Sequence, residues 1–473
     1  MIRPSARRAL VIVIALATLV ACTRTTVEPA DTTARSQPWP ERPVVELRFD
    51  VADDLASVIG RESVEFTPDQ RICELVFRAW PNKPTTAEDG TSLSVTDAAV
   101  GGRPVEPVVS SGGAPGDAAG TVVTLPLPEC SDPGTPVRAD LGFTLVLGRD
   151  AGERVGHMPS AEIAWFATAF PLLAWVRGEG WVRDPAVGMA GETVTSEDFR
   201  LAELAVTAAD AYQVLGTGRE QSVEPGPRPG AAVHRFAADA VRDVAVSVGR
   251  FTVAEREVDG IRYHVGVPAR GSRVDADEWV DSLETAVTKL QDFLGPYPYT
   301  DLWATVLPPL EDGVEFPGAL QFGDVGRRTI PALVAHEVAH MWFYGLVGNN
   351  QARNPWIDES FATYAQARVA GQADSYPLPD PDDRVQGHLG EPMAYWAQNG
   401  DFGRYVDGVY DQGAAVLLEG RRQSDEAAFD AALRAYVDAN AHRVAGPGDV
   451  AVAFRQLPEV TSLLQRYGAL PDS

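Results

Sequence analysis

Apolar and polar positions repeat with two different periods along this chain, and the change falls near residue 270. In residues 41–250, short apolar runs are separated by clusters of Gly, Pro and Asp, which is typical of β-strands joined by turns. The clearest runs are 44–50, 73–80, 121–126 and 141–147. Strands of this length predict a β-sandwich-like domain over residues 41–250.

The second part of the chain, residues 251–473, has the helical period of 3.6. A helix is predicted over residues 275–295, with a natural stop at Gly295; its apolar stripe is Trp279, Leu283, Ala286, Leu290 and Phe293. Residues 302–307 predict a strand that ends at two prolines. This mixture indicates an α+β domain, and the region from residue 410 to 464 is expected to be helical.

Two further helices are expected between residues 330 and 370. The first opens with Pro331 and is predicted to run through Phe343 toward Gly345. Asn354 and Pro355 supply the cap and the first residue of the second. The two helices matter because the residues that can carry chemistry lie on them.

Residues 1–21 have the composition of an export signal. Three arginines precede the apolar run 9–17, which is too short for a stable membrane span. The signal segment ends in Leu-Val-Ala followed by Cys22. This ending resembles the lipobox of bacterial lipoproteins, in which the cysteine is lipidated. We therefore expect export to the bacterial cell envelope, with a lipid anchor at Cys22 and a flexible tether over residues 22–40. A plain secretory signal with an incidental cysteine is the alternative.

The composition restricts the partners of the chain. A formal net charge of −26 argues against nucleic acid and against a basic membrane-binding patch, so membrane attachment would depend on the lipid at Cys22. Two other cysteines, Cys73 and Cys130, are present and form no CxxC pair. In an oxidising compartment they can form a disulfide; two buried free thiols are the alternative.

The chemistry-bearing residues gather in one short region. His336 and His340, in His-Glu-Val-Ala-His, are four residues apart, so on a helix both imidazoles can face one metal ion. Glu359 follows after eighteen intervening residues. Zinc in hydrolases takes three protein ligands and leaves a fourth position for water. His336, His340 and Glu359 thus predict one zinc ion per chain, with Glu337 as the base; a buried histidine pair without metal is the alternative.

Three segments resemble the aminopeptidase N and leukotriene hydrolase family of gluzincin zinc peptidases. Residues 356–362 read W-I-D-E-S-F-A, like the family's W-x-x-E-x-F-A. Residues 312–317 are similar to its G-G-M-E-Y-P segment, and residues 409–414 to Y-E-K-G-A. The resemblance implies a multidomain α and β fold: an N-terminal β-sandwich-like (saddle) domain, then a thermolysin-like α+β zinc peptidase domain. It also implies a form without the large C-terminal helical domain of many relatives.

The same resemblance implies roles for two more residues. Glu315 would bind the free α-amino group of a peptide substrate, and Tyr410 would donate a hydrogen bond to the tetrahedral intermediate. Tyr405 is the competitor for the second role. A strand-edge surface glutamate and a packed core tyrosine are the structural alternatives.

Two departures from the family pattern bear on specificity. Asp312, Val314 and Phe316 replace the family's Gly, Met, and Asn or Tyr around Glu315. In addition, residues 168–171 offer no Gln or Glu to help bind the amino terminus. We expect a zinc metallopeptidase that acts on peptides, foremost an aminopeptidase. The alternatives are an endopeptidase or amide hydrolase of the same fold and a non-catalytic envelope lipoprotein. The motifs carry no information on side-chain preference or oligomeric state.

Overall fold

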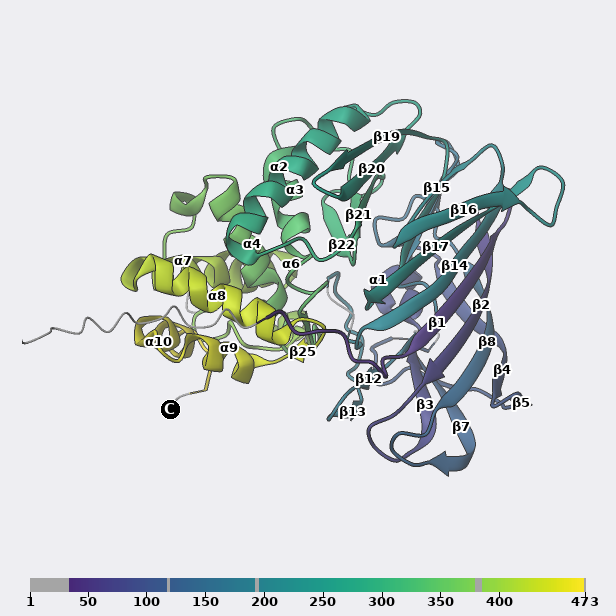
Figure 1. Ribbon diagram of the computed structural model, residues 1–473, viewed down its shortest axis with the longest axis horizontal. Helices are drawn as coiled ribbons and strands as arrows, with labels where there is room; N and C mark the ends of the chain where they lie inside the picture. Colours follow the sequence, from purple (N-terminus) through teal and green to yellow (C-terminus); the bar gives the residue numbers. More distant parts are fainter. Residues whose placement is uncertain (1–33, 117–119, 192–194, 379–384, 472–473) are drawn as a thin grey trace, which may run out of the picture. The chain divides into compact units, whose positions relative to one another are not determined.

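The part of the chain with period two folds into β-sheets, as its pattern predicts (Figure 1). The computed structural model describes residues 34–116, 120–191, 195–378 and 385–471. The signal segment, Cys22 and the start of the predicted tether lie outside the described residues. In the ranges described, no helix is long and apolar enough to cross a membrane.

The largest sheet has eight strands in the order β16-β17-β14-β1-β2-β8-β4-β5. Along β1, alternate residues such as Leu47 and Phe49 are buried, so one face of the sheet covers the core. Among the described strands of this sheet, β1 and β14 are the only neighbours that pair in parallel. The strands are β16 (Arg219–Pro225), β17 (Ala231–Val241), β14 (Phe199–Ala209), β1 (Val44–Val51), β2 (Ser57–Phe66), β8 (Val137–Val146), β4 (Ser92–Val100) and β5 (Arg103–Pro104).

Two four-stranded sheets and a small hairpin complete the β domain. Phe49 of the large sheet packs edge-on against Phe166 of β10, with ring centroids 5.2 Å apart, so the sheets share one core. One sheet contains β15 (Gln213–Gly216), β18 (Ala245–Gly249), β10 (Ile163–Ala167) and β9 (Val155–Met158). The other contains β11 (Leu172–Leu173), β3 (Ile72–Arg78), β7 (Val122–Ser131) and β6 (Val108–Ser110), and the hairpin β12 (Trp175–Val176) and β13 (Gly180–Trp181).

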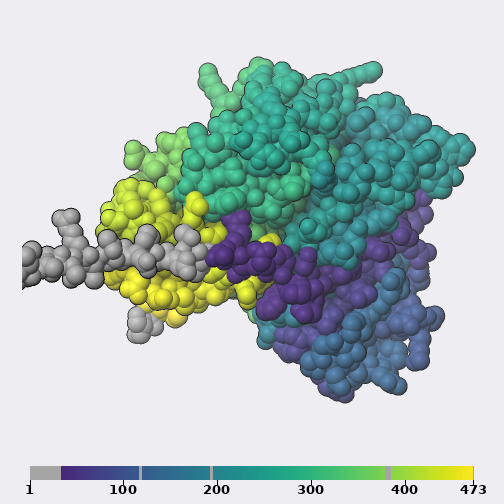
Figure 2. All heavy atoms as spheres, viewed as in Figure 1, coloured from purple at the N-terminus to yellow at the C-terminus, as the bar shows by residue number. Residues whose placement is uncertain are grey.

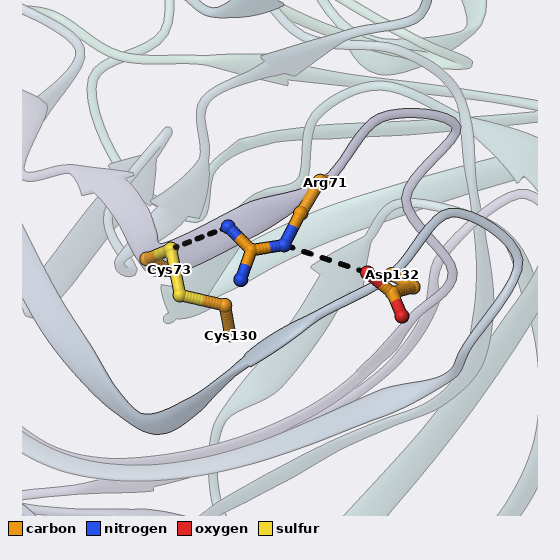
Figure 3. Close-up of a disulfide and its surroundings, with 4 residues drawn as sticks. All are labelled: Arg71, Cys73, Cys130 and Asp132. Carbon is orange, nitrogen blue, oxygen red and sulfur yellow. Dashed lines mark hydrogen bonds and ion pairs between the residues drawn. A yellow bond between two sulfur atoms is a disulfide. The ribbon is translucent and has the colours of Figure 1, made fainter.

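A disulfide joins Cys73 of β3 to Cys130 of β7 (Figure 3). The two strands are antiparallel neighbours, and their register shifts at this position. Arg71 lies against the sulfur, with its Nη1 atom 3.7 Å from Cys73 Sγ. Of the two possibilities for these cysteines, the structure has the bridge, which closes a long loop and contributes on the order of 4 kcal/mol through chain entropy.

The α+β domain is built on a five-stranded sheet in the order β19-β20-β21-β23-β22. Its strands are β19 (Phe251–Val258), β20 (Ile261–Pro268), β21 (Asp301–Val306), β23 (Ala319–Phe322) and β22 (Gly313–Phe316). Strand β22 is an antiparallel edge strand, and it carries Glu315. The predicted first helix is α2 (Ala276–Leu294), which Asp275 caps by accepting from the backbone N–H of Glu278 and which Gly295 ends at φ 93°.

Helices α3 (Ile330–Ala339) and α4 (Trp356–Val369) pack against each other, with α2 against α3 and α7 against α4. Helix α3 ends at Ala339, not near Gly345 as predicted, because Met341 and Trp342 form tight turns and Tyr344 adopts φ 83°. Pro355 takes the cap position of α4, not its first residue.

The other helical segments and the last two strands are short. They are η1 (Trp80–Asn82), α1 (Pro84–Glu88), η2 (Ala373–Ser375), α5 (Met393–Asn399), α6 (Phe402–Tyr405), the π-helix η3 (Val406–Asp411), α7 (Gln412–Gln423), α8 (Glu426–Asn440), α9 (Pro447–Phe454), α10 (Pro458–Arg466), β24 (Gly348–Asn349) and β25 (Val444–Ala445). Helices α7 to α10 agree with the predicted helical C-terminal region.

The described end of the predicted tether contacts the α+β domain. The backbone N–H of Ser36 donates to the carbonyl oxygen of Asp438 at 2.8 Å, and Arg35 forms an ion pair with the Asp438 carboxylate at 3.1 Å. Figure 2 shows this purple segment beside the yellow C-terminal helices. Residues 35 and 36 are therefore held against α8 and are not part of a free tether.

Candidate active site

Helices α3 and α4 bring the three predicted metal ligands together. His336 lies in the last turn of α3, His340 directly after its end, and Glu359 in the first turn of α4. The Nε2 atom of His336 lies 3.2 Å from Glu359 Oε2 and 3.1 Å from His340 Nε2. The same Glu359 oxygen lies 3.4 Å from His340 Nε2. Two nitrogens and one carboxylate oxygen thus converge on one point.

The other nitrogen of each imidazole is held by a hydrogen-bond acceptor. His340 Nδ1 lies 2.7 Å from Asp358 Oδ1, and His336 Nδ1 lies 3.1 Å from Gln366 Oε1. Because both oxygens accept, each Nδ1 carries the hydrogen and each Nε2 presents a lone pair. Asp358 is fixed in turn by Gln351, whose Nε2 donates to its second oxygen at 2.6 Å.

This donor set fits a zinc ion. Two lone pairs 3.1 Å apart beside a carboxylate repel one another unless a cation lies between them, and two imidazoles with one carboxylate are a usual zinc set. Glu315, His340 and Asp358 also lie within reach of a common ion. However, Asp358 already accepts from His340 Nδ1 and Gln351, so it orients a ligand and leaves the first set as the metal site.

Glu337 lies on α3 between the two histidines and lines the same cavity, which has a volume of about 770 Å³. Burial raises its pKa well above the ordinary value; His340 opposes the rise, and Glu315 and Glu359 add to it. A Cβ atom at Gly313 of β22 would meet the Glu337 carboxyl at 2.5 Å, so the close approach of the two elements needs glycine. A buried carboxyl at this place can serve to accept and release a proton.

Glu315 and Tyr410 line the cavity as well. Burial raises the pKa of Glu315 to about 7, while the neighbouring His340 lowers it. Tyr410, on η3, stacks its ring on His336 with centroids 5.8 Å apart. Tyr405 is fully buried, packs edge-on against Tyr410 and does not line the cavity. Of the two tyrosines, only Tyr410 can reach a substrate in this geometry.

The β domain also contributes to the cavity, through residues that the sequence did not indicate. Glu153 and Arg154, next to β9, line it. Glu153 pairs with Lys83, its Oε1 lying 3.2 Å from the lysine Nζ. Thr168 belongs to residues 168–171, which offer no Gln or Glu for amine binding. Its hydroxyl donates to Asp243 Oδ2 at 2.6 Å, and it does not line the cavity.

Buried bonds between the two domains fix the chain just after the second histidine. Tyr344 donates its hydroxyl hydrogen to Asp243 Oδ2 at 3.1 Å, and Arg242 donates to the carbonyl oxygen of Gly345 at 3.1 Å. The N–H of Gly345 donates to the His340 carbonyl oxygen at 2.8 Å. The β domain thereby helps to position the metal site.

Among the site residues that the sequence analysis did not identify, some could have been found from their spacing to the motif. Gln366 lies seven residues after Glu359, two turns along the same face of α4, so a role beside the metal was readable from spacing. Asp358, adjacent to Glu359, had a weaker signal of the same kind. Arg154 had none, since it is far from the motif in sequence and reaches the cavity only through the fold.

A protein-family model described as the peptidase family M1 domain matches residues 323–386. This segment includes the whole of α3 and of α4. Over this segment the chain is similar to peptidase family M1. The predicted family is therefore confirmed, and zinc is the metal on which its metallopeptidases depend.

Two curated relatives match part of this chain. Leukotriene A-4 hydrolase of Xenopus laevis is 32% identical over 88 residues, which is 17% of this chain and 14% of the relative. Aminopeptidase N of Streptomyces lividans is 30% identical over 132 residues, which is 25% of this chain and 15% of the relative. The matches thus span about one seventh of the length of these relatives.

Solved structures match nearly the whole chain. The crystal structure of an M1 zinc metallopeptidase mutant from Deinococcus radiodurans has a TM-score of 0.64 at 16% identity, covering 90% of this chain and 93% of that one. The same mutant bound to the substrate Tyr-Ser-Ala has the same TM-score, at 16% identity, with 92% and 95% covered. At this identity the likeness shows the fold, and it confirms the predicted multidomain α and β class.

Proposed function

We propose that this M1 protein is a zinc-dependent aminopeptidase that releases N-terminal residues from peptides outside the cytoplasm. The observation that carries the proposal is the presence of Glu315 in the same cavity as the His336, His340 and Glu359 site. A carboxylate at this place can hold the ammonium of a peptide so that its first peptide bond lies at the metal site. Such a peptide is cut after its first residue.

The residues of the chain divide the proton transfers among them. Zinc, when held by His336, His340 and Glu359, polarises a carbonyl group and lowers the pKa of water toward about 7. Glu337 takes a proton from the attacking water on its carboxylate and gives it to the departing amine. Its buried position and raised pKa suit both transfers.

Tyr410 acts on the oxygen of the carbonyl group under attack. Its ring stacks on His336, which holds the phenol at the wall of the cavity. From there its hydroxyl can donate a hydrogen bond to the oxygen as negative charge develops, and such a bond stabilises the transition state more than the ground state.

The proposed location rests on the N-terminal sequence. The signal-like residues 1–21 and the cysteine at position 22 favour an exported lipoprotein held at the outer face of the membrane. The disulfide between Cys73 and Cys130 agrees with an oxidising compartment. Mass spectrometry of the N-terminal peptide from the native host tests this: a diacylated Cys22 supports the anchor, and an unmodified Met1 rules it out.

A pair of peptides tests the aminopeptidase proposal. The zinc-loaded protein is given Leu-Ala-Ala and its N-acetylated form, and the released leucine is measured. We expect cleavage of the free peptide and a loss of at least about a hundredfold for the blocked one, because Glu315 has no ammonium to bind. Equal rates would favour the endopeptidase alternative, and no cleavage of either peptide would defeat the proposal.

A further inference from the structure

Arg154 places a buried positive charge in the wall of the cavity. Its side chain belongs to the β domain and is only 8% exposed. Its backbone carbonyl accepts from the N–H of Ala167 in β10 at 3.0 Å, so the residue stands on a rigid sheet. One guanidinium nitrogen, NH2, donates to the carbonyl oxygen of Gly191 at 3.2 Å. An arginine carries five N–H donors in a planar fork and stays charged, so most of its donors remain for other partners.

The protein itself does not use those donors for an ion pair. The Nε atom of Arg154 is buried and has no hydrogen-bond partner. Among the described residues, no carboxylate forms an ion pair with Arg154, and the adjacent Glu153 pairs with Lys83 instead. A buried guanidinium with unused donors is costly unless a ligand completes its bonds.

Arg154 lies close enough to Glu315 for their charges to interact. Burial alone would lower the pKa of Arg154, but the negative charges of Glu153 and Glu315 raise it above its ordinary value. Burial raises the pKa of Glu315, and Arg154 is among the cations that counter the rise. The cavity therefore presents one carboxylate and one guanidinium together, which matches a substrate residue that carries both an ammonium and a carboxylate.

We propose that Arg154 binds the side-chain carboxylate of the substrate's N-terminal residue, so that peptides beginning with Glu or Asp are preferred. The proposal rests on the proposed aminopeptidase function. With the ammonium at Glu315, the side chain of the same residue lies in this part of the cavity, where Arg154 can donate two parallel hydrogen bonds to one carboxylate.

The acids that line the cavity away from the metal site and Glu315 do not cancel this charge. Glu311 and Asp312 line it at exposed positions, where water and salt screen their charges. Glu153 is neutralised locally by Lys83. Arg154 is thus the buried cation that an acidic side chain meets.

The alternative is that Arg154 only balances Glu315 within the fold. The two roles differ in one measurable respect. A carboxylate-binding role affects acidic substrates selectively, whereas a balancing role affects all substrates alike. The ratio of kcat/KM for a Glu peptide to that for the isosteric Gln peptide separates them.

The test uses the zinc-loaded full chain with Glu-Ala-Ala, Gln-Ala-Ala and Leu-Ala-Ala. We expect the wild-type ratio of Glu to Gln to be at least about tenfold, since a charge-assisted bond replaces a neutral one. Arg154→Gln should bring the ratio close to one while the Leu peptide is still cleaved. Arg328→Gln, which removes the same charge from the exposed rim, should keep the wild-type ratio.

Three outcomes overturn the proposal. A wild-type ratio of one or less, with normal cleavage of the Leu peptide, contradicts it directly. An unchanged ratio in Arg154→Gln, or an equal loss on all three peptides in a folded variant, leaves only the balancing role. If circular dichroism shows that Arg154→Gln is unfolded, the test uses the ratio of kcat/KM for the Glu and Gln peptides in the wild-type protein and in Arg154→Lys. Failure of the aminopeptidase function itself is separate, because the wild-type protein would then cleave none of the peptides.

Discussion

The two halves of the cavity are built differently. In the metal half, His336 and His340 each have the second ring nitrogen held by a side-chain oxygen, and Gln351 donates to the other oxygen of the Asp358 carboxylate that holds His340. In the recognition half, Glu315 lies on an edge strand and Arg154 has a buried nitrogen without a partner. Both histidines thus have the second ring nitrogen bonded within the protein, whereas Arg154 has donors left for a ligand. Under the proposed function, the fold positions the reacting groups and leaves selectivity to groups whose bonds a ligand completes.

The largest effect should come from the base in the metal half. Glu337→Gln keeps the shape of the side chain and both histidines, but it cannot take a proton from water. We expect kcat to fall by about a thousandfold or more while zinc stays bound. Steady-state kinetics and metal analysis of the same sample measure both. Glu311→Gln, at the exposed rim, should keep near-normal activity; a Glu337→Gln protein with wild-type kcat would show that another group is the base.

The next largest effect should be a pH dependence of stability that comes from Asp243, which accepts a hydrogen bond from Tyr344 of the other domain. Burial raises the pKa of Asp243 to about 6, although hydrogen bonds from Thr168 and Tyr344 oppose the rise. The folded state therefore holds this proton more tightly than the unfolded state. Its contribution to stability is complete below about pH 4 and is lost as the pH rises toward 6, by about 3 kcal/mol.

Asp243→Asn should remove this pH dependence, because an amide does not titrate in that range. Denaturant unfolding of both proteins at pH 4 and at pH 7 measures it as the change in the free energy of unfolding between the two values. The fall from pH 4 to pH 7 should be smaller in the variant. An equal fall in both proteins would place the titrating group elsewhere.

Tyr410 tests whether the π-helix η3 belongs functionally to the metal half. Tyr410→Phe removes only the hydroxyl, and we expect kcat to fall by about a hundredfold with little change in KM, as for loss of an oxyanion donor. Tyr405→Phe is the matched control, since Tyr405 is buried beside Tyr410 and does not line the cavity. A larger loss of activity in the Tyr405 variant would reverse the assignment.

The smallest effect should come from the residue that orients His340. Asp358→Asn keeps one oxygen acceptor but removes the negative charge that stabilises the ring hydrogen. Zinc affinity should weaken by about tenfold to a hundredfold. Competition with a fluorescent zinc chelator gives the Kd. An unchanged Kd would mean that the metal half does not depend on its second layer of hydrogen bonds.

The sequence was sufficient for the parts of this site that depend on local geometry. Four-residue spacing on a helix places His336 and His340 on one face, so their convergence follows from the helix itself. The resemblance supplied Glu315 and Tyr410. Even here the end of α3 was misplaced, because Tyr344 leaves the helical course to reach Asp243 in the other domain.

The recognition half could not be predicted in the same way. Arg154 is 161 positions from Glu315 in the chain, and only the packing of the β domain against the α+β domain brings both to one cavity. No periodicity or motif in the sequence indicates that these two residues lie close together in the fold. The unmatched segment at residues 168–171 indicated that amine binding differs here, but it did not indicate that a cation lies nearby.

The central claim is that His336, His340 and Glu359 hold one zinc ion. The most direct measurement is elemental analysis of the purified protein together with X-ray absorption at the zinc edge. We predict one zinc per chain with two imidazole nitrogens and a carboxylate oxygen around it, and loss of that zinc in His336→Ala. A protein that binds no zinc, or that binds it equally well in His336→Ala, would contradict the account.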